Sequence, residues 1–205
     1  RGLGDVYKRQ IQNYIGLTDI SIACGGLHIP DDDSQYANNI RYCMERKYEK
    51  HNTAKERQTK PYNNFNTSNF IVKREIILNI PFDTRFRKYG YEDVFWGKQL
   101  KEQNIPILHI DNPILLDDLE TNPEFISKME EGMDTLYTFK EDLKGYSGVI
   151  RMSEKLERMK FKYTFHFIFN IFRETIKRNL IGNRPVIPLI NIYKLGVFVN
   201  KDYRK

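Results

Sequence analysis

Three runs of apolar and β-branched residues predict β-strands. Residues 19–26, DISIACGG, are mostly apolar and end at two glycines, which is the pattern of a buried strand closed by a turn. Residues 65–72 have the same character, and residues 106–117 predict one or two short strands broken at Asn112 and Pro113. We expect these three segments to share one sheet.

Helical patterns surround the predicted strands. A basic helix is predicted over residues 34–50, another over about 91–103, and a long basic and aromatic helix over about 152–179. A further helix is expected to begin at Asn122 as its N-cap and to extend as far as Lys144. Mixed strands and helices predict a layered α/β fold with a helical C-terminal appendage.

The first ten residues differ in character from the rest. DVYKRQ, within residues 1–10, resembles the conceptual translation of a transposon mosaic-end sequence used in library adapters, with a native loop as the alternative. We expect the native sequence to start near Ile11. The chain is therefore divided into an adapter-derived segment (1–10), an α/β part (11–148) and a basic aromatic appendage (149–205).

Charge and cysteine content narrow the possible partners. The 205-residue chain has a formal charge of +6, concentrated in residues 41–60 and 151–178, which suits an anionic nucleotide, phospholipid surface or nucleic acid. No nucleic-acid-binding module is recognisable, so we expect no nucleic-acid partner. Cys24 and Cys43 lack CxxC spacing, which favours a reducing compartment. No run of 18 apolar residues predicts a transmembrane helix.

Two adjacent carboxylates lie between aromatic residues in RKYGYEDVFWGKQL, residues 87–100. In the first turn of a helix, Glu92 and Asp93 could simply interact with the helix dipole, worth ~0.3–1 kcal/mol. However, Gly97 lies one turn after Asp93, and a glycine inside a helix costs roughly 1 kcal/mol relative to alanine, so we expect something to approach closely there. Trp96 offers a flat apolar wall. A carboxylate beside such a wall suits sugar binding and removal of a hydroxyl proton.

Several motifs together resemble a known family. They are T-x-N-F (67–70), I-x-F-D (80–83) and Y-G-x-E-D-x-x-x-G-x-x-L (89–100), and ISIACGG and KPYNNF also fit. Over roughly residues 20–145 the chain is similar to the C-terminal half of a family 2 glycosyltransferase domain, closest to bacterial members in surface-polysaccharide assembly. The resemblance implies a partial GT-A fold, a mixed sheet flanked by helices.

The resemblance also implies an activity and a site. The activity is inverting, hexosyltransferase-like transfer from a nucleotide-sugar to a glycan or lipid-linked acceptor. Asp93 is implied as the base that deprotonates the acceptor hydroxyl, and Glu92 as a residue that binds acceptor or orients Asp93. Asn69 is implied to lie in the donor–acceptor cleft, with a strand-terminal turn residue as the alternative. The predicted substrate-binding residues are Glu92, Asn69, Trp96, Tyr91 and Gly97. A non-catalytic carbohydrate- or membrane-binding module is the alternative function.

The family resemblance implies a divalent metal, Mg²⁺ or Mn²⁺, on the diphosphate of the donor. Its D-x-D ligands are expected upstream with the nucleotide-binding half, so we expect this chain alone to be inactive. Asp31–Asp33 could chelate a metal, but a solvated loop is the preferred interpretation. Relatives often carry a histidine where Leu116 stands; Asp117 or Asp118 could replace that ligand. His109 is predicted to be a core histidine, and no metal ligand is assigned.

The appendage carries an aromatic stripe. At helical spacing, one face would contain Phe161, Phe165, Ile168, Phe172 and Ile176. The stripe could pack against the catalytic domain. The sharper hypothesis is that residues 152–179 form a helix in an anionic bilayer interface. The predicted location is cytoplasmic and peripheral on the inner face of the plasma membrane.

Overall fold

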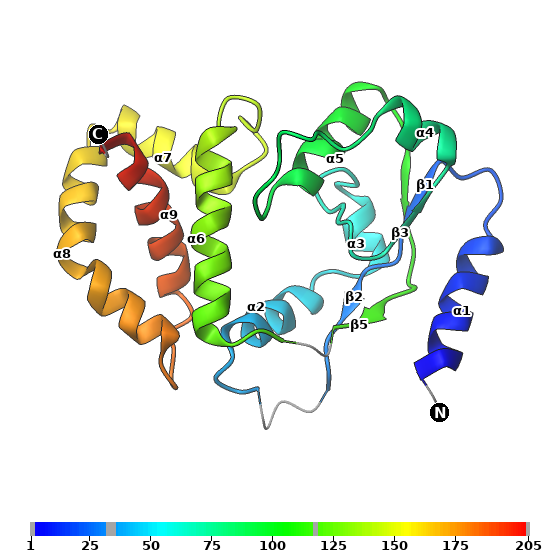
Figure 1. Ribbon diagram of the computed structural model, residues 1–205, viewed down its shortest axis with the longest axis horizontal. Coiled ribbons are helices and arrows are strands. Elements are labelled where there is room, and N and C mark those ends of the chain that lie inside the picture. Colours follow the sequence, from blue (N-terminus) through cyan, green and yellow to red (C-terminus); the bar gives the residue numbers. More distant parts are fainter. Residues whose placement is uncertain (1–2, 32–35, 117–118, 204–205) are drawn as a thin grey trace. The chain divides into compact units, whose positions relative to one another are not determined.

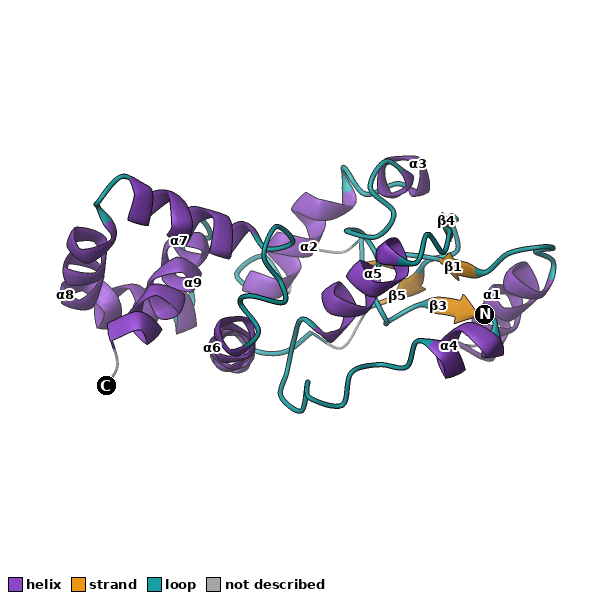
Figure 2. Ribbon diagram, turned by 90° about the horizontal axis from the view of Figure 1, so that it is seen from above, coloured by secondary structure: helices purple, strands orange, loops and turns teal. Residues whose placement is uncertain are grey.

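The computed structural model describes residues 3–31, 36–116 and 119–203, in two compact units (Figure 1). The first unit contains residues 1–31, 45–84 and 92–118, and the second contains residues 32–44, 85–91 and 119–205. Every strand of the described chain belongs to the first unit, whereas α6 to α9 of the second unit are helices (Figure 2). The chain is therefore of mixed α/β class, as predicted.

The first unit is organised by a mixed three-stranded sheet with β1 (Ile22–Cys24) at its centre. Strand β3 (Phe70–Val72) pairs with β1 antiparallel, and β4 (Ile107–His109) pairs with it in parallel. The prediction that the three apolar segments share a sheet is confirmed. The residues directly after the first segment also pair in parallel with the end of the third, β2 (Leu27–His28) with β5 (Ile114–Leu115).

The sequence predicted the bounds of one helix of the first unit closely. Helix α5 (Glu92–Glu102) matches the helix expected over 91–103. Helix α1 begins within the segment predicted to be adapter-derived, whose origin stays a prediction. The other helices that contribute to this unit are α1 (Leu3–Ile15), α2 (Ile40–Glu49), α3 (Ala54–Gln58) and α4 (Arg74–Asn79).

The core of the first unit forms around the Trp96 ring of α5. The side chain is fully buried, and its Nε1–H donates to the Ile80 carbonyl at 2.7 Å. The rings of Phe65, Phe70 and Phe82 lie 5.0, 5.9 and 4.7 Å from it between centroids. Aromatic side chains bury large areas and favour tilted or edge contacts of this kind. Trp96 therefore fixes the position of α5 in this unit.

Gly97 allows α5 to lie close to the loop after α3. A Cβ atom at this position would stand 2.6 Å from the carbonyl oxygen of Tyr62. The close approach inferred from a glycine inside a helix is thus made by the chain's own backbone.

The second unit is a helical bundle of α6 (Asn122–Thr138), α7 (Gly148–Arg158), α8 (Lys162–Ile181) and α9 (Leu189–Asn200), followed by the short 3₁₀ helix η1 (Lys201–Tyr203). Helix α9 lies between α6 and α8 in both views (Figures 1 and 2). Phe169 of α8 packs directly on Gly196 of α9, where a Cβ would come within 2.3 Å of the ring. The bundle contains α6 as well as the predicted appendage of residues 149–205.

The prediction of one helix over residues 152–179 is wrong. The segment forms α7 and α8, separated at residues 159–161, where Lys160 has a left-handed backbone with φ of 60°. An L-residue in this conformation ends a right-handed helix. The break lets the two helices pack against α9 separately.

The N-cap of α6 is also one residue earlier than predicted. Thr121, not Asn122, caps the helix, and it forms a reciprocal capping box with Glu124. The Asn122 side chain instead accepts a hydrogen bond from the Ile40 backbone N–H at the start of α2, at 2.8 Å. Asn122 therefore satisfies a backbone N–H at the start of a different helix, α2.

Substituting Gly97 by alanine should destabilise the protein by roughly 1–3 kcal/mol, because the added methyl group collides with a backbone carbonyl that cannot rotate away. Gly132 in α6 is the matched control, because a Cβ there would meet nothing closer than 3.8 Å. Gly132→Ala should be stabilising by ~0.4–1 kcal/mol. Urea denaturation followed by circular dichroism measures both. Equal effects of the two substitutions would contradict the close packing at Gly97.

Candidate active site

Asp93 lies in the first turn of α5 with a partly buried carboxyl group. Its Oδ1 accepts a hydrogen bond from the backbone N–H of Val94 at 2.7 Å. Burial raises the pKa of Asp93 above its ordinary value, and the adjacent Glu92 carboxylate raises it further, while the Val94 hydrogen bond opposes the shift. A carboxyl group with a raised pKa is a better proton acceptor when ionised than an exposed aspartate.

Glu92 has a buried oxygen atom that is not paired. Its Oε2 is inaccessible to solvent and has no hydrogen-bond partner among the described residues. Leaving a buried acceptor unsatisfied costs about 1–3 kcal/mol. Such groups need an explanation, and Oε1 of Gln10 and Oε1 of Gln99 are buried and unpaired in the same way.

The turn that leads into α5 has a strained backbone. Gly90 and Tyr91 are both left-handed, with φ of 94° and 71°. Glycine adopts this conformation freely, but a residue with a Cβ pays roughly 1 kcal/mol or more. Strain of this kind is often found at active sites, where it sets the direction of catalytic side chains. Tyr91 directly precedes Glu92 and Asp93 in the sequence.

Asn69 occupies a buried position at the start of β3, 7% exposed. Its Nδ2 donates to the carbonyls of Gly26 and Asn112, both at 2.8 Å, and its Oδ1 accepts from the Tyr14 hydroxyl at 2.7 Å. Every polar atom of this side chain is used within the protein. The geometry favours the alternative in which Asn69 is a structural residue at a strand end, and none of these partners belongs to α5.

Two further predicted substrate-binding residues face the interior. The Trp96 ring is 0% exposed, so it is not available as a wall for a sugar ring. Gly97 is covered by the Tyr62 carbonyl rather than left open for a ligand. Both residues support the site by holding α5 against the core.

Arg57 of α3 is a structural residue that the sequence pattern did not reveal. It is only 4% exposed, and its guanidinium donates to the Ile110 carbonyl at 2.7 Å and to His109 Nδ1 at 3.3 Å. A Cβ at Gly26, which has φ of 82°, would stand 2.7 Å from that guanidinium. The two glycines of the 19–26 segment were a signal for this arrangement, because Gly25 and Gly26 leave room for buried polar side chains.

His109 is a core histidine, as predicted. Its ring is 5% exposed, Nδ1 accepts from Arg57, and Nε2 lies 3.0 Å from the Pro61 carbonyl. These partners assign the proton to Nε2. Burial lowers the pKa of His109, with the positive Arg57 acting in the same direction, so the ring is held neutral.

Metal coordination is not supported within the described residues, in which no group of three or more His, Cys, Asp or Glu side chains is placed to hold an ion. Asp31 lies at the surface, 3.5 Å from the Arg46 guanidinium. The Leu116 N–H donates to the His28 carbonyl at 2.8 Å. The other predicted alternatives, Asp32, Asp33, Asp117 and Asp118, lie outside the described residues. The described residues therefore supply no ligand set for the divalent metal that the resemblance implies, whose D-x-D ligands are expected upstream.

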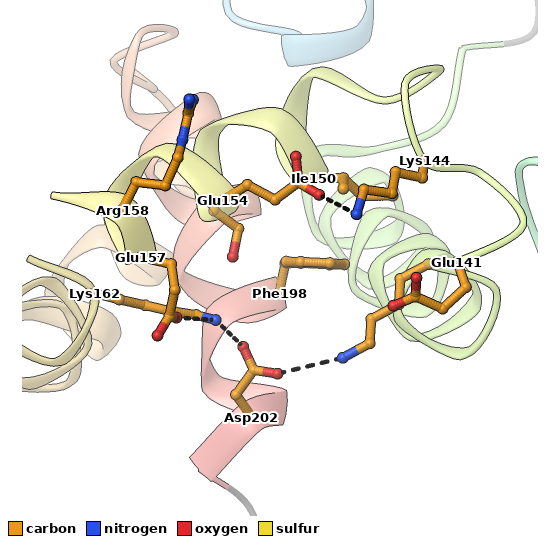
Figure 3. A pocket seen from close by; sticks show the side chains of 11 residues that line it. Glu141, Lys144, Ile150, Glu154, Glu157, Arg158, Lys162, Phe198 and Asp202 are labelled. Carbon is orange, nitrogen blue, oxygen red and sulfur yellow. Dashed lines mark ion pairs between the residues drawn. The ribbon is translucent and has the colours of Figure 1, made fainter. Parts of the chain in front are cut away.

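A cavity of about 560 Å³ in the second unit is lined mainly by charged residues (Figure 3). Lys162 pairs with Glu157 and Asp202 at 2.7 and 2.8 Å, and Lys144 pairs with Glu154 at 3.4 Å. The carboxylates on its walls thus neutralise these two lysines. We assign the ion pairs of this cavity a structural role, because those of Lys162 join α8 to α7 and to η1.

Comparisons with known proteins identified no relative: no family model matches the chain, and no curated protein or solved structure is significantly similar. The resemblance to family 2 glycosyltransferases therefore rests on the sequence motifs alone.

Asp93→Asn should raise the melting temperature near neutral pH. Because the folded-state pKa is raised, the ionised carboxylate opposes folding above that pKa, and the penalty disappears below the ordinary pKa of aspartate. The gain should therefore shrink as the pH falls through the pKa of Asp93. Thermal unfolding followed by circular dichroism between neutral and acid pH measures this.

Glu124 provides a control of opposite sign, because it is also a first-turn carboxylate. Hydrogen bonds from Thr121 lower the pKa of Glu124, so its charge stabilises the fold above the ordinary pKa of glutamate. Glu124→Gln should lower the melting temperature at neutral pH, and this loss should fade as the pH falls through the lowered pKa. A lower melting temperature for Asp93→Asn at neutral pH would contradict the assigned burial.

Proposed function

We propose that this chain supplies the acceptor-side part of an inverting glycosyltransferase, with Asp93 as the general base. The observation that carries the proposal is the partly buried Asp93 carboxyl with a raised pKa, placed next to the unsatisfied Oε2 of Glu92. The substrate class is a nucleotide-sugar donor and a glycan or lipid-linked acceptor in surface-polysaccharide synthesis. This substrate class follows from the family resemblance of the motif around residues 89–100.

Asp93 has the chemistry that the reaction needs. In inverting transfer, the acceptor hydroxyl oxygen attacks the anomeric carbon from the face opposite the leaving nucleoside diphosphate. The C–O bond to the acceptor forms as the bond to the diphosphate breaks, and Asp93 takes the hydroxyl proton. General-base assistance of this kind contributes typically ~10²–10⁴-fold.

Glu92 acts as an acceptor-binding residue in this proposal. In the complex, a hydroxyl group of the acceptor sugar donates to the Glu92 carboxylate, whose Oε2 has no partner among the described residues. This contact orients the acceptor toward the neighbouring Asp93. No step of the proposal passes through a metal held by the described residues, because they do not fit one.

The raised pKa favours an enzyme over a non-catalytic carbohydrate-binding module. An ordinary exposed carboxylate is sufficient to accept a hydrogen bond from a sugar hydroxyl. Burying Asp93 costs stability, and the benefit appears only when the group must remove a proton. The alternative, a binding module, offers no reason for that cost.

The test is sugar transfer by a gene product in which residues 11–205 follow a D-x-D-containing nucleotide-binding segment, the arrangement that the resemblance implies. Asp93→Asn preserves the size of the side chain but removes its basicity, so transfer should fall by ~10²–10⁴-fold. Donor affinity, measured by calorimetry with the nucleotide-sugar, should remain close to that of the parent. Glu92→Gln should raise mainly the acceptor KM.

Glu124→Gln is the matched control for this test, because it also removes a first-turn carboxylate but lies on α6. It should leave transfer per folded molecule unchanged. Near-parental transfer by Asp93→Asn would reject Asp93 as the base.

A further inference from the structure

Helix α8 turns its polar side chains toward the bundle. Lys177 pairs with Glu130 of α6 at 2.9 Å, and Lys162 pairs with Asp202 of η1 at 2.8 Å. His166 Nδ1 lies 2.8 Å from Asn200 Oδ1. Together with the Phe169 ring on α9, these contacts occur along most of the helix and fix which face of α8 points inward.

The opposite face of α8 is apolar and exposed. Phe167, Ile168, Ile171 and Phe172 are 58%, 49%, 60% and 53% exposed. A helix on the surface of a globular protein normally presents polar side chains to water. Here Lys162 and Lys177 are paired inside, and the aromatic and aliphatic residues lie outside with the exposed Glu174 and Arg178. We call these four side chains the outer α8 patch.

Positive charge surrounds the outer α8 patch. Residues 149–203 contain eleven Lys and Arg against four Asp and Glu, so the positive excess of this segment exceeds the +6 of the whole chain. Lys160 lies two residues before the helix. Arg178 follows Ile171 by seven residues, which places it on the same face. Both are exposed and form no ion pair with another described residue, as is also true of Arg158 and Arg184.

We propose that the outer α8 patch docks into the interface of an anionic phospholipid bilayer. The four apolar side chains enter the headgroup–acyl boundary, and the unpaired cations lie at the level of the lipid phosphates. Tyr163, 67% exposed at the edge of the patch, has the amphipathic ring favoured at such interfaces. The helix lies along the surface: within the described residues, no helix combines the length and apolarity needed to cross a bilayer.

Charge distinguishes the bilayer from a second copy of the chain. In a symmetric dimer through this face, the cations of one α8 would meet those of the other, and like charges at a buried interface oppose association. Anionic lipid headgroups supply the opposite charge instead. The inference is independent of the proposed transferase activity, because lipid binding requires neither donor nor acceptor.

The test is co-sedimentation of the full chain with vesicles of phosphatidylcholine, with and without phosphatidylserine. We expect binding to the anionic vesicles and little to the neutral ones. Phe167→Ser/Ile171→Ser should weaken binding by roughly tenfold or more, and should keep the parental melting temperature because both side chains are exposed. The matched control is Tyr48→Ser/Leu78→Ser, which removes two equally exposed apolar side chains elsewhere and should bind like the parent.

A second pair of variants tests the contribution of the positive charge around the outer α8 patch. Lys160→Gln/Arg178→Gln should weaken binding by roughly tenfold, whereas Lys47→Gln/Lys50→Gln, with the same net charge, should not. Equal binding by the parent and both α8 variants would overturn the proposal. Absence of binding to anionic vesicles would also overturn it, as would a dimer in sedimentation equilibrium that Phe167→Ser/Ile171→Ser abolishes.

Discussion

Burial of the Trp96 ring is the constraint on which the candidate site depends. Three phenylalanine rings and a hydrogen bond to Ile80 hold the indole in the core, and the position of α5 follows from it. Gly97 then lets the helix lie against the Tyr62 carbonyl. With its middle fixed in this way, α5 presents its first turn as a rigid platform. A base must be held within a fraction of an ångström to be effective, and helices provide such precision better than loops do.

The first turn of α5 is where the fold departs from what stability alone would favour. Tyr91 has a left-handed backbone, Glu92 has an unsatisfied buried oxygen, and burial raises the pKa of Asp93. Each of these features costs free energy, and three consecutive residues share them. Asn69, by comparison, is satisfied by partners inside the protein, whereas Oε1 of Gln10 and Oε1 of Gln99 are buried and unpaired like Oε2 of Glu92. The functional interpretation of residues 91–93 therefore rests on the coincidence of the three features, and Asn69 is interpreted as structural.

The sequence predicted the strands and α5 well, because each has a local apolar pattern and because glycines mark the end of β1 and the start of α5. It failed where the outcome depends on single backbone conformations or on tertiary packing. The apolar period continues through Lys160, so nothing in the pattern revealed the left-handed residue that separates α7 from α8. The capping box of Thr121 and Glu124 was readable as T-x-x-E and was missed in favour of Asn122. The direction of Trp96 could not be derived, because helical spacing does not say which face meets the sheet.

The pH dependence of kcat/KM for sugar transfer, at saturating donor, tests the assignment of Asp93 most directly. A general base must be ionised to work, so kcat/KM for the acceptor should rise with pH through the pKa of this group in the donor-bound enzyme. Because burial raises the pKa of Asp93, we expect this ascending limb of the pH profile to have its midpoint above the ordinary pKa of aspartate. We also expect Asp93→Asn to lose the limb altogether. A limb at the ordinary aspartate pKa that persists unchanged in Asp93→Asn would contradict the account.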